Sequence, residues 1–146
     1  MSIASRTAET TWNGALESGA GTIDGASGAL EKLPVTWAAR TERPGGKTSP
    51  EELAAAAHSS CYSMALAMRL GEHGVTADRL TVSSTVTLDA VDGLPTIVSS
   101  ALTVTAAAPG LDDATFQQIV DEASALCPVS RLFAGATITV DASLES

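Results

Sequence analysis

Two cysteines are the residues of this sequence best suited to carry chemistry. Cys61 follows the polar residues HSS inside a long apolar segment, and Cys127 comes directly before Pro128. The thiolate is the reactive form of cysteine, and a nearby positive charge or a helix amino terminus favours it. Buried cysteines also pack as small apolar side chains without any reactivity. The two positions therefore predict either thiol chemistry or inert packing, depending on the elements around them.

The element that carries Cys61 is predicted as one long helix over residues 49–74. Its ends are marked by a serine N-cap, a proline at the first helical position, a glutamate that completes a capping box, and a closing glycine: Ser49, Pro50, Glu52, and Gly71 or Gly74. From 53 to 70 the helix is apolar on nearly every face, so it must be covered on all sides. One sheet covers one side, and we expect a partner subunit to cover another.

Cys127 is predicted to be the N-cap of a short helix that starts at Pro128, where the helix dipole favours a thiolate. The alternative is that Pro128 only ends the preceding helix. Positive charge is available in the loop before the long helix, because Arg40, Arg43 and Lys47 supply three of the eight Lys and Arg residues.

The other segments alternate between strand and helix patterns. Apolar and polar residues alternate cleanly over 80–89 and 136–144, which predicts strands with one buried face. We also predict strands at 33–39 and 96–106, a loop over 39–49, hairpin turns at Asn13-Gly14 and Asp92-Gly93, and an amphipathic helix that begins at Asp112 or Asp113. Antiparallel hairpins with two helices indicate an α+β fold, and the length suits one domain spanning 1–146.

The composition excludes several classes of partner. Asp and Glu outnumber Lys and Arg by 17 to 8, for a net charge of -9, and no basic stretch exists. This argues against binding to nucleic acids and to anionic membranes, both of which need clustered positive charge. No segment has the length of a signal peptide or a membrane span. We therefore expect a cytoplasmic protein with reduced thiols.

The string PEELAAAAHSSCYSMAL resembles the signature helix of the OsmC/Ohr family of thiol-dependent peroxidases, and CPVS resembles the family's second cysteine motif. The form AAHSSC is similar to the OsmC branch, and the resemblance covers essentially the whole chain. It implies an OsmC-like α+β fold with antiparallel sheets packed on two main helices. It also implies an intertwined homodimer with a long buried central helix, and a role in oxidative and osmotic stress defence.

The resemblance also implies roles for individual residues. Cys61 matches the peroxidatic cysteine, Cys127 the resolving cysteine, and Glu51 the glutamate that holds the catalytic arginine. Arg40 matches that arginine best, but the loop up to Pro50 is one residue longer than the family pattern, so Arg43 is the alternative. The implied reaction reduces an organic hydroperoxide, and also hydrogen peroxide, through a Cys61 sulfenic acid and a Cys61–Cys127 disulfide. An external dithiol, of lipoyl type in some relatives, regenerates the thiols, without cofactor or metal.

Helix geometry places a condition on these roles. If 51–61 is one continuous helix, Glu51 lies about 15 Å along the axis from Cys61 and roughly 80° around it. The two side chains then cannot meet at one guanidinium. Either the helix begins later, or the arginine and glutamate act on the cysteine of the other subunit of a two-fold dimer, which we favour as a hypothesis.

Other interpretations of the same residues stay open. His58 lies one turn before Cys61, which suits either a Cys–His pair or a packed histidine. A zinc site would need His58, Cys61, His73 and Cys127, without compact ligand spacing. A general thiol–disulfide oxidoreductase is disfavoured because the sequence has no CxxC motif. The alternative function is a non-catalytic protein that binds a small apolar ligand in a pocket at the dimer interface.

Overall fold

The computed structural model describes all residues, 1–146. Contacts within the chain divide it into two compact units, residues 1–53 and residues 54–146. Each unit is described by itself. The expectation of a single domain over the whole chain stays a prediction.

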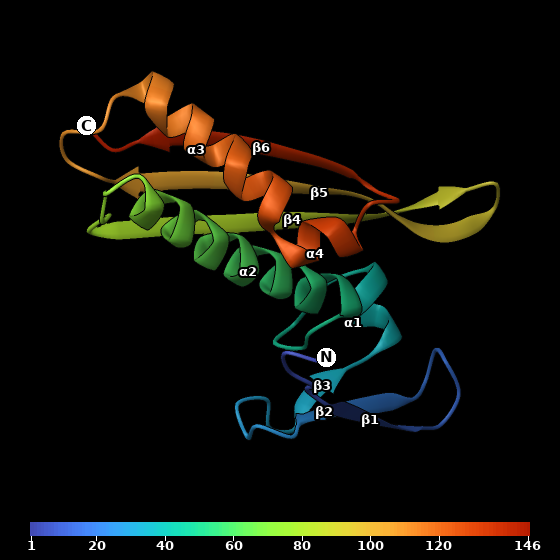
Figure 1. Ribbon diagram of the computed structural model, residues 1–146. Coiled ribbons are helices and arrows are strands. Elements are labelled where there is room, and N and C mark those ends of the chain that lie inside the picture. Colours follow the sequence, from blue (N-terminus) through green and yellow to red (C-terminus); the bar gives the residue numbers. More distant parts are fainter. The chain divides into compact units, whose positions relative to one another are not determined.

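The amino-terminal unit is built on a three-stranded antiparallel sheet in the order β1-β2-β3 (Figure 1). Its strands are followed by one short helix: β1 (Ala8–Asn13), β2 (Ala20–Gly25), β3 (Leu33–Val35) and α1 (Trp37–Thr41). The predicted hairpin after Asn13 is confirmed, with Gly14 in the left-handed region at φ 93°. Residues 14–19 connect its strands.

The predicted strand over 33–39 is wrong in its second half. β3 stops at Val35, and the hydroxyl of Thr36 accepts a hydrogen bond from the Ala39 amide at 3.1 Å, which makes Thr36 the N-cap of α1. A capped turn of this kind competes with strand pairing because it satisfies an amide that a sheet would otherwise have to satisfy. Arg40 consequently lies in the last turn of a short helix and not in a loop.

The long helix is confirmed as α2 (Pro50–Glu72). Ser49 caps it by accepting the Glu52 amide at 3.1 Å, but the Glu52 carboxylate accepts from the Thr48 hydroxyl at 2.7 Å and does not complete the capping box. Gly74, at φ 75°, closes the helix in a Schellman arrangement. In that arrangement the Val75 amide donates to the carbonyl of Leu70 at 2.9 Å.

The larger unit contains a second three-stranded sheet in the order β4-β5-β6 (Figure 1). Its strands are β4 (Arg79–Val91), β5 (Leu94–Ala107) and β6 (Thr137–Leu144). The predicted antiparallel pairing of β4 and β5 is confirmed, and Asp92 and Gly93 make the turn with φ angles of 51° and 77°. β6 runs parallel to β5, so this sheet is mixed and not purely antiparallel.

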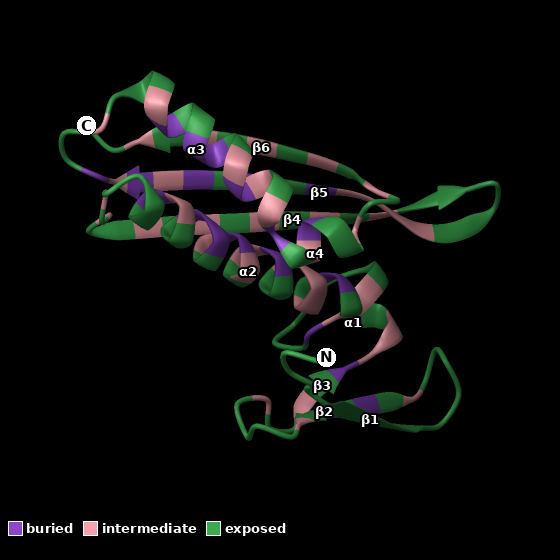
Figure 2. Cartoon of the chain, viewed as in Figure 1, coloured by how far each residue is buried: buried purple, intermediate pink, exposed green.

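The core of this unit lies between the sheet and two helices, α2 and α3 (Asp113–Leu126) (Figures 1 and 2). Asp112 is the N-cap of α3, and its carboxylate accepts the Thr115 amide at 2.9 Å. As its helical spacing predicts, α3 buries Phe116, Ile119, Val120 and Ala123. These pack with side chains from α2 and β5: Tyr62, Ala65, Leu66, Leu70, Leu102, Val104 and Ala106.

The outer face of α2 is exposed in the single chain. Met64 keeps 67% of its accessible surface and Met68 keeps 48%, although both are large apolar side chains. They belong to a stripe at helical spacing that also contains Ala57, Ser60, Ala67 and Gly71. The sequence predicted that this helix is covered on every face, but the single chain leaves this face uncovered. No helix of the structure combines the length and apolar character that crossing a membrane requires.

Candidate active site

The two cysteines lie close together in the larger unit, and each shifts the pKa of the other. Both are free thiols. Cys61 sits in the middle of α2 and is partly exposed, whereas Cys127 is completely buried. Since the two cysteines are 66 positions apart in the sequence, the packing of α2 against the end of α3 brings them together.

Cys127 occupies the N-cap of a short helix, α4 (Pro128–Leu132), with Pro128 at its first position, as predicted. Burial raises the pKa of Cys127, but hydrogen bonds outweigh it and hold this pKa below its ordinary value. The Ser130 amide donates to the sulfur at 3.5 Å, and the Ser130 hydroxyl, the Cys61 thiol and the Val129 amide lower the pKa of Cys127 as well. The site therefore stabilises a thiolate at Cys127.

Cys61 experiences the opposite effect. Burial raises its pKa above the ordinary value, and the neighbouring Cys127 raises it further, against a hydrogen bond from the Val129 amide. The two sulfurs titrate as a pair in which negative charge settles first on Cys127. A thiolate at Cys61 consequently requires an additional positive charge beside its sulfur.

An apolar groove of about 340 Å³ opens beside Cys61. It is lined by Cys61, Met64, Ala65, Met68, Leu126 and Pro128. No lining side chain except the cysteine can ionise, so the groove suits an uncharged, apolar molecule. The exposed sulfur of the pair is therefore the one that meets an apolar reactant.

Arg40 and Glu51, in the amino-terminal unit, form a bidentate ion pair. The Arg40 Nη2 donates to Oε1 of Glu51 at 2.8 Å, and Nε donates to Oε1 and Oε2 at 3.0 and 3.1 Å. The guanidinium also lies 5.9 Å from the ring centroid of Trp37. Because the carboxylate and the ring fix its plane, the guanidinium is a rigid donor fork with its Nη1 group left over. Arg43 is exposed and forms no salt bridge.

A second apolar pocket, of about 230 Å³, lies at Arg40. Its walls include two tryptophans and three aliphatic side chains from the small sheet, its first loop and α1: Trp12, Trp37, Leu16, Ile23 and Val35. Arg40 is the only charged side chain of the lining, and apolar surface surrounds it. Such a pocket suits a ligand with a polar group on an apolar molecule.

His58 is completely buried and contacts neither cysteine directly. Its Nδ1 lies 2.6 Å from the Ser100 hydroxyl and its Nε2 lies 2.8 Å from the Ser130 hydroxyl. Both ring nitrogens are therefore occupied, which excludes the Cys–His pair considered from the sequence. The serine partners were missed because they lie 42 and 72 residues away. Ser130 belongs to the CPVS motif, which was the available signal.

The zinc site considered from the sequence is not assembled. No group of three or more His, Cys, Asp and Glu residues is close enough to hold a metal ion. His73 instead pairs with Glu122, with 3.0 Å between Nε2 and Oε2.

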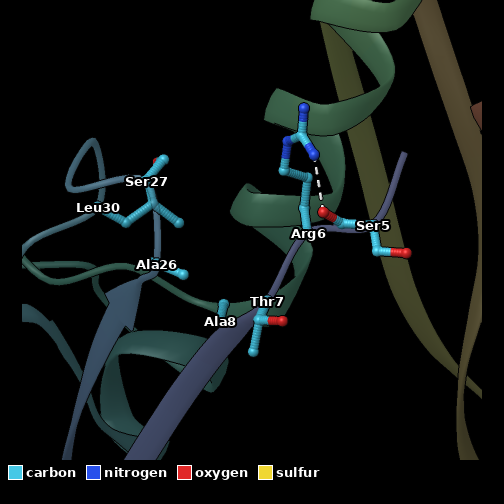
Figure 3. A pocket seen from close by; sticks show the side chains of 8 residues that line it. Ser5, Arg6, Thr7, Ala8, Ala26, Ser27 and Leu30 are labelled. Atoms are coloured by element: carbon cyan, nitrogen blue, oxygen red, sulfur yellow. Dashed lines mark hydrogen bonds between the residues drawn. The ribbon is translucent and has the colours of Figure 1, made fainter. Parts of the chain in front are cut away.

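A third hollow, of about 550 Å³, lies in the amino-terminal unit and is a weak candidate for catalysis (Figure 3). Its lining contains no cysteine, histidine or carboxylate, so its serines have no base to activate them. The one charged side chain there, Arg6, donates to the neighbouring carbonyl of Ser5 at 2.7 Å. The cysteine pair remains the candidate active site.

Comparison with known proteins decides the family. The sequence profile of the family described as OsmC-like protein matches residues 43–143. The chain belongs to the OsmC-like family. The matched region contains Glu51, Cys61 and Cys127, and Arg40 precedes it. The chain is 42% identical over 135 residues to the peroxiredoxin OsmC of Escherichia coli K12, and this match covers 92% of the chain and 93% of the relative.

Solved structures agree with this assignment of the OsmC-like family. The organic hydroperoxide resistance protein OhrB of Bacillus subtilis superposes with a TM-score of 0.72 at 26% identity, covering 95% of this chain and 98% of that one. An OsmC protein of Legionella pneumophila superposes over the full length of both chains with a TM-score of 0.75 at 22% identity, which is a likeness of fold. The predicted OsmC-like α+β fold is confirmed.

Proposed function

We propose that this chain is a thiol-dependent peroxidase that reduces organic hydroperoxides, and also hydrogen peroxide, to the alcohol or water. The observation that carries the proposal is the interacting pair of thiols at Cys61 and Cys127, with Cys61 opening into an apolar groove. Relatives with printed roles as a peroxiredoxin and as an organic hydroperoxide resistance protein support it.

In the first step the Cys61 thiolate attacks the terminal oxygen of the hydroperoxide. The O–O bond breaks, Cys61 becomes a sulfenic acid, and the departing alkoxide takes up a proton to leave as an alcohol. Cys61 is the peroxidatic residue in this scheme because its sulfur is accessible, whereas that of Cys127 is enclosed. The apolar groove holds the organic part of the hydroperoxide.

In the second step the Cys127 thiolate attacks the sulfur of the sulfenic acid. An S–S bond forms, the S–O bond breaks, and the hydroxide leaves as water after taking up a proton. The lowered pKa of Cys127 suits this task because the attacking sulfur must be ionised. An external dithiol, such as a lipoyl-type reductant, then reduces the disulfide, a cycle that suits a reducing compartment such as the cytoplasm.

Arg40, held by Glu51, is proposed as the cation that favours the Cys61 thiolate and binds the peroxide oxygens. Its fixed geometry supports this choice over Arg43, which has no carboxylate partner. α2 contains both Glu51 and Cys61 without a break. This continuity supports a homodimer in which the Arg40–Glu51 pair of one chain serves the Cys61 of its partner.

The homodimer is also supported by the exposed stripe on α2, where Met64 and Met68 leave apolar surface in water. Analytical ultracentrifugation at micromolar concentration tests it. We expect a dimer that dissociates when Met64 is replaced by glutamate, and a monomeric parent protein would contradict the composite site.

The proposed function is tested by titrating the reduced protein with cumene hydroperoxide and with hydrogen peroxide while free thiols are counted. We expect one equivalent to remove both thiols of each chain rapidly, and the faster oxidant identifies the preferred class of peroxide. Survival of both thiols in a large excess of either peroxide would contradict the proposal and favour the binding of a small apolar ligand without catalysis.

A further inference from the structure

A buried chain of hydrogen bonds connects the sheet to the resolving cysteine. Ser84 on β4 lies 2.9 Å from Ser100 on β5, Ser100 lies 2.6 Å from Nδ1 of His58, and Nε2 of His58 lies 2.8 Å from Ser130. The amide of Ser130 in turn donates to the sulfur of Cys127 at 3.5 Å, and its hydroxyl lowers the pKa of that thiol. His58 and Ser100 are completely inaccessible to solvent, and Ser130 keeps 9% of its surface. The β4–β5 hairpin, α2 and α4 therefore contribute to one continuous chain of polar side chains, which we call the polar line.

The position of the His58 proton determines whether Ser130 can donate a hydrogen bond to Cys127. Each serine hydroxyl has one proton to donate, and a neutral histidine carries one proton on one of its two nitrogens. If Ser100 donates to Nδ1, His58 carries its proton on Nε2 and donates to Ser130. The Ser130 proton is then free to point at Cys127. If the proton sits on Nδ1, Ser130 has to donate to Nε2 and gives nothing to the sulfur.

We propose that His58 is a positioning residue for the resolving step. With its proton on Nε2, His58 donates to the Ser130 oxygen, and the Ser130 hydroxyl proton is thereby directed at Cys127. This inference rests on the proposed function, because it assigns Cys127 the attack on the Cys61 sulfenic acid. The attack forms the S–S bond and releases hydroxide, as described above, and His58 exchanges no proton with the reacting atoms.

The surroundings of His58 support a fixed, neutral ring. Burial lowers the pKa of His58, so the uncharged form with a single N–H is the one present at neutral pH. The ring of Phe133 meets it edge-on, with centroids 5.3 Å apart and an interplanar angle of 87°. Phe133 directly follows α4, so the same short segment that carries Ser130 also restricts the ring that orients it.

The titratable groups that act on Cys127 itself come from α2. Cys61 and Tyr62 both interact with its charge, and the Tyr62 hydroxyl donates to the Val120 carbonyl at 2.8 Å. The other members of the core cluster around Cys127 are apolar. No lysine, arginine or carboxylate is among the groups that shift its pKa, so hydrogen-bond donors have to stabilise the thiolate.

Two amide substitutions separate the two contacts of His58. In His58→Gln the amide nitrogen can reach the position of Nε2 and still donate to Ser130. In His58→Asn the shorter amide reaches the position of Nδ1, so the contact with Ser100 is kept and that with Ser130 is lost. Ser100→Ala keeps the imidazole and removes only the group that orients its proton, which provides a second variant if His58→Asn does not fold. His73→Asn is the matched control at the exposed histidine.

The first measurement is a titration of the Cys127 thiolate by its ultraviolet absorbance, made in a Cys61→Ser background and independent of any peroxide. We expect His58→Asn and Ser130→Ala to lower the thiolate fraction at neutral pH about tenfold, the size of a lost charge-assisted hydrogen bond. Ser100→Ala should lower it less, and His58→Gln and His73→Asn should match the parent. Because His58 acts through Ser130, combining His58→Asn with Ser130→Ala should add nothing to Ser130→Ala alone.

The second measurement is rapid mixing of the Cys61-containing proteins with cumene hydroperoxide, following first sulfenic acid formation and then disulfide formation. We expect His58→Asn to slow the second phase about tenfold and to leave the first unchanged, with rescue by His58→Gln. Equal slowing of both phases, or a parent-like titration for His58→Asn and Ser100→Ala, would overturn the positioning role. A parent that fails to react with peroxide would instead refute the proposed function, and the titration would still decide on His58.

Discussion

The two cysteines of the active site present a contrast within one contact. Cys61 is partly exposed at an apolar groove and has a raised pKa, whereas Cys127 is completely enclosed and has a lowered pKa. Exposure thus makes the Cys61 sulfur accessible to a reactant, whereas hydrogen bonding favours ionisation of the Cys127 sulfur. Access and ionisation are thus controlled separately in the two cysteines. In the proposed mechanism, packing selects the sulfur that meets the peroxide, and donors at the start of α4 prepare the sulfur that attacks second.

The contrast also gives the arginine of the proposed mechanism a specific task. In the single chain the negative charge of the pair settles on Cys127, which is the wrong place for the first attack. A guanidinium beside Cys61 would reverse this order by favouring a thiolate there. The rigid Arg40–Glu51 pair has the geometry for that task. Replacing Arg40 should therefore show which of the two cysteines ionises first without the cation.

The largest effect is expected from Cys61→Ser. A serine hydroxyl does not ionise at neutral pH, so no sulfenic acid forms and turnover of cumene hydroperoxide with a dithiol should be undetectable in a coupled assay. The Cys127 thiolate remains in this variant. Peroxide consumption at a rate near that of the parent would mean that Cys127 is the peroxidatic residue and that the comparison is reversed.

Cys127→Ser should separate the two steps. The variant is expected to consume one equivalent of hydroperoxide per chain and then to stop, because the Cys61 sulfenic acid has no resolving thiolate. Intact-protein mass spectrometry should find a chain that has gained one oxygen atom, followed on longer exposure by further oxidation. Sustained turnover with a dithiol would show that Cys127 is dispensable.

Arg40→Ala is expected to slow sulfenic acid formation about a hundredfold, the usual cost of losing one fixed charge-stabilising group. It should also move the pH at which this rate levels off upward, since the pKa of Cys61 stays raised without the cation. Arg43→Ala is the matched control and should leave the rate and the pH profile unchanged in stopped-flow measurements. The reverse ranking of the two variants would assign the catalytic role to Arg43.

The smallest effect concerns the apolar groove. Met68→Ala removes apolar contact surface worth roughly 1 kcal/mol, so kcat/KM for cumene hydroperoxide should fall about fivefold, with little change for hydrogen peroxide. Leu94→Ala, at the exposed turn between β4 and β5, is the control and should change neither value. Because Met68 also belongs to the proposed dimer surface, ultracentrifugation must first find the variant dimeric. Equal losses for both peroxides in dimeric Met68→Ala would then show that the groove does not hold the organic group.

Local signals in the sequence account for the parts of the fold that were predicted. The Ser49 cap and the closing Gly74 define α2, strict alternation defines β4, and Pro128 leaves Cys127 at an N-cap. Each of these depends on neighbours within a few residues, which is why a single sequence shows them. The resemblance added Arg40 and Glu51 as candidates, and the structure joins them in one ion pair.

The parts that were missed depend on distant residues or on competing local contacts. Residues 33–39 were predicted as one strand, but the Thr36 cap ends that strand and starts α1 at Trp37. The parallel pairing of β6 with β5 and the serines around His58 join segments tens of residues apart, and no local pattern encodes them. The polar line that reaches Cys127 was therefore invisible in a sequence that showed only its histidine and the serine of CPVS.

The most direct test of the division of labour is to trap the first sulfenic acid. The reduced parent is mixed with one equivalent of cumene hydroperoxide, quenched at short times with dimedone, and digested for peptide mass spectrometry. The account predicts that the adduct appears on Cys61 alone and disappears as the Cys61–Cys127 disulfide forms. An adduct that appears first on Cys127 would contradict it, because hydrogen bonding and not access would then select the sulfur that reacts with peroxide.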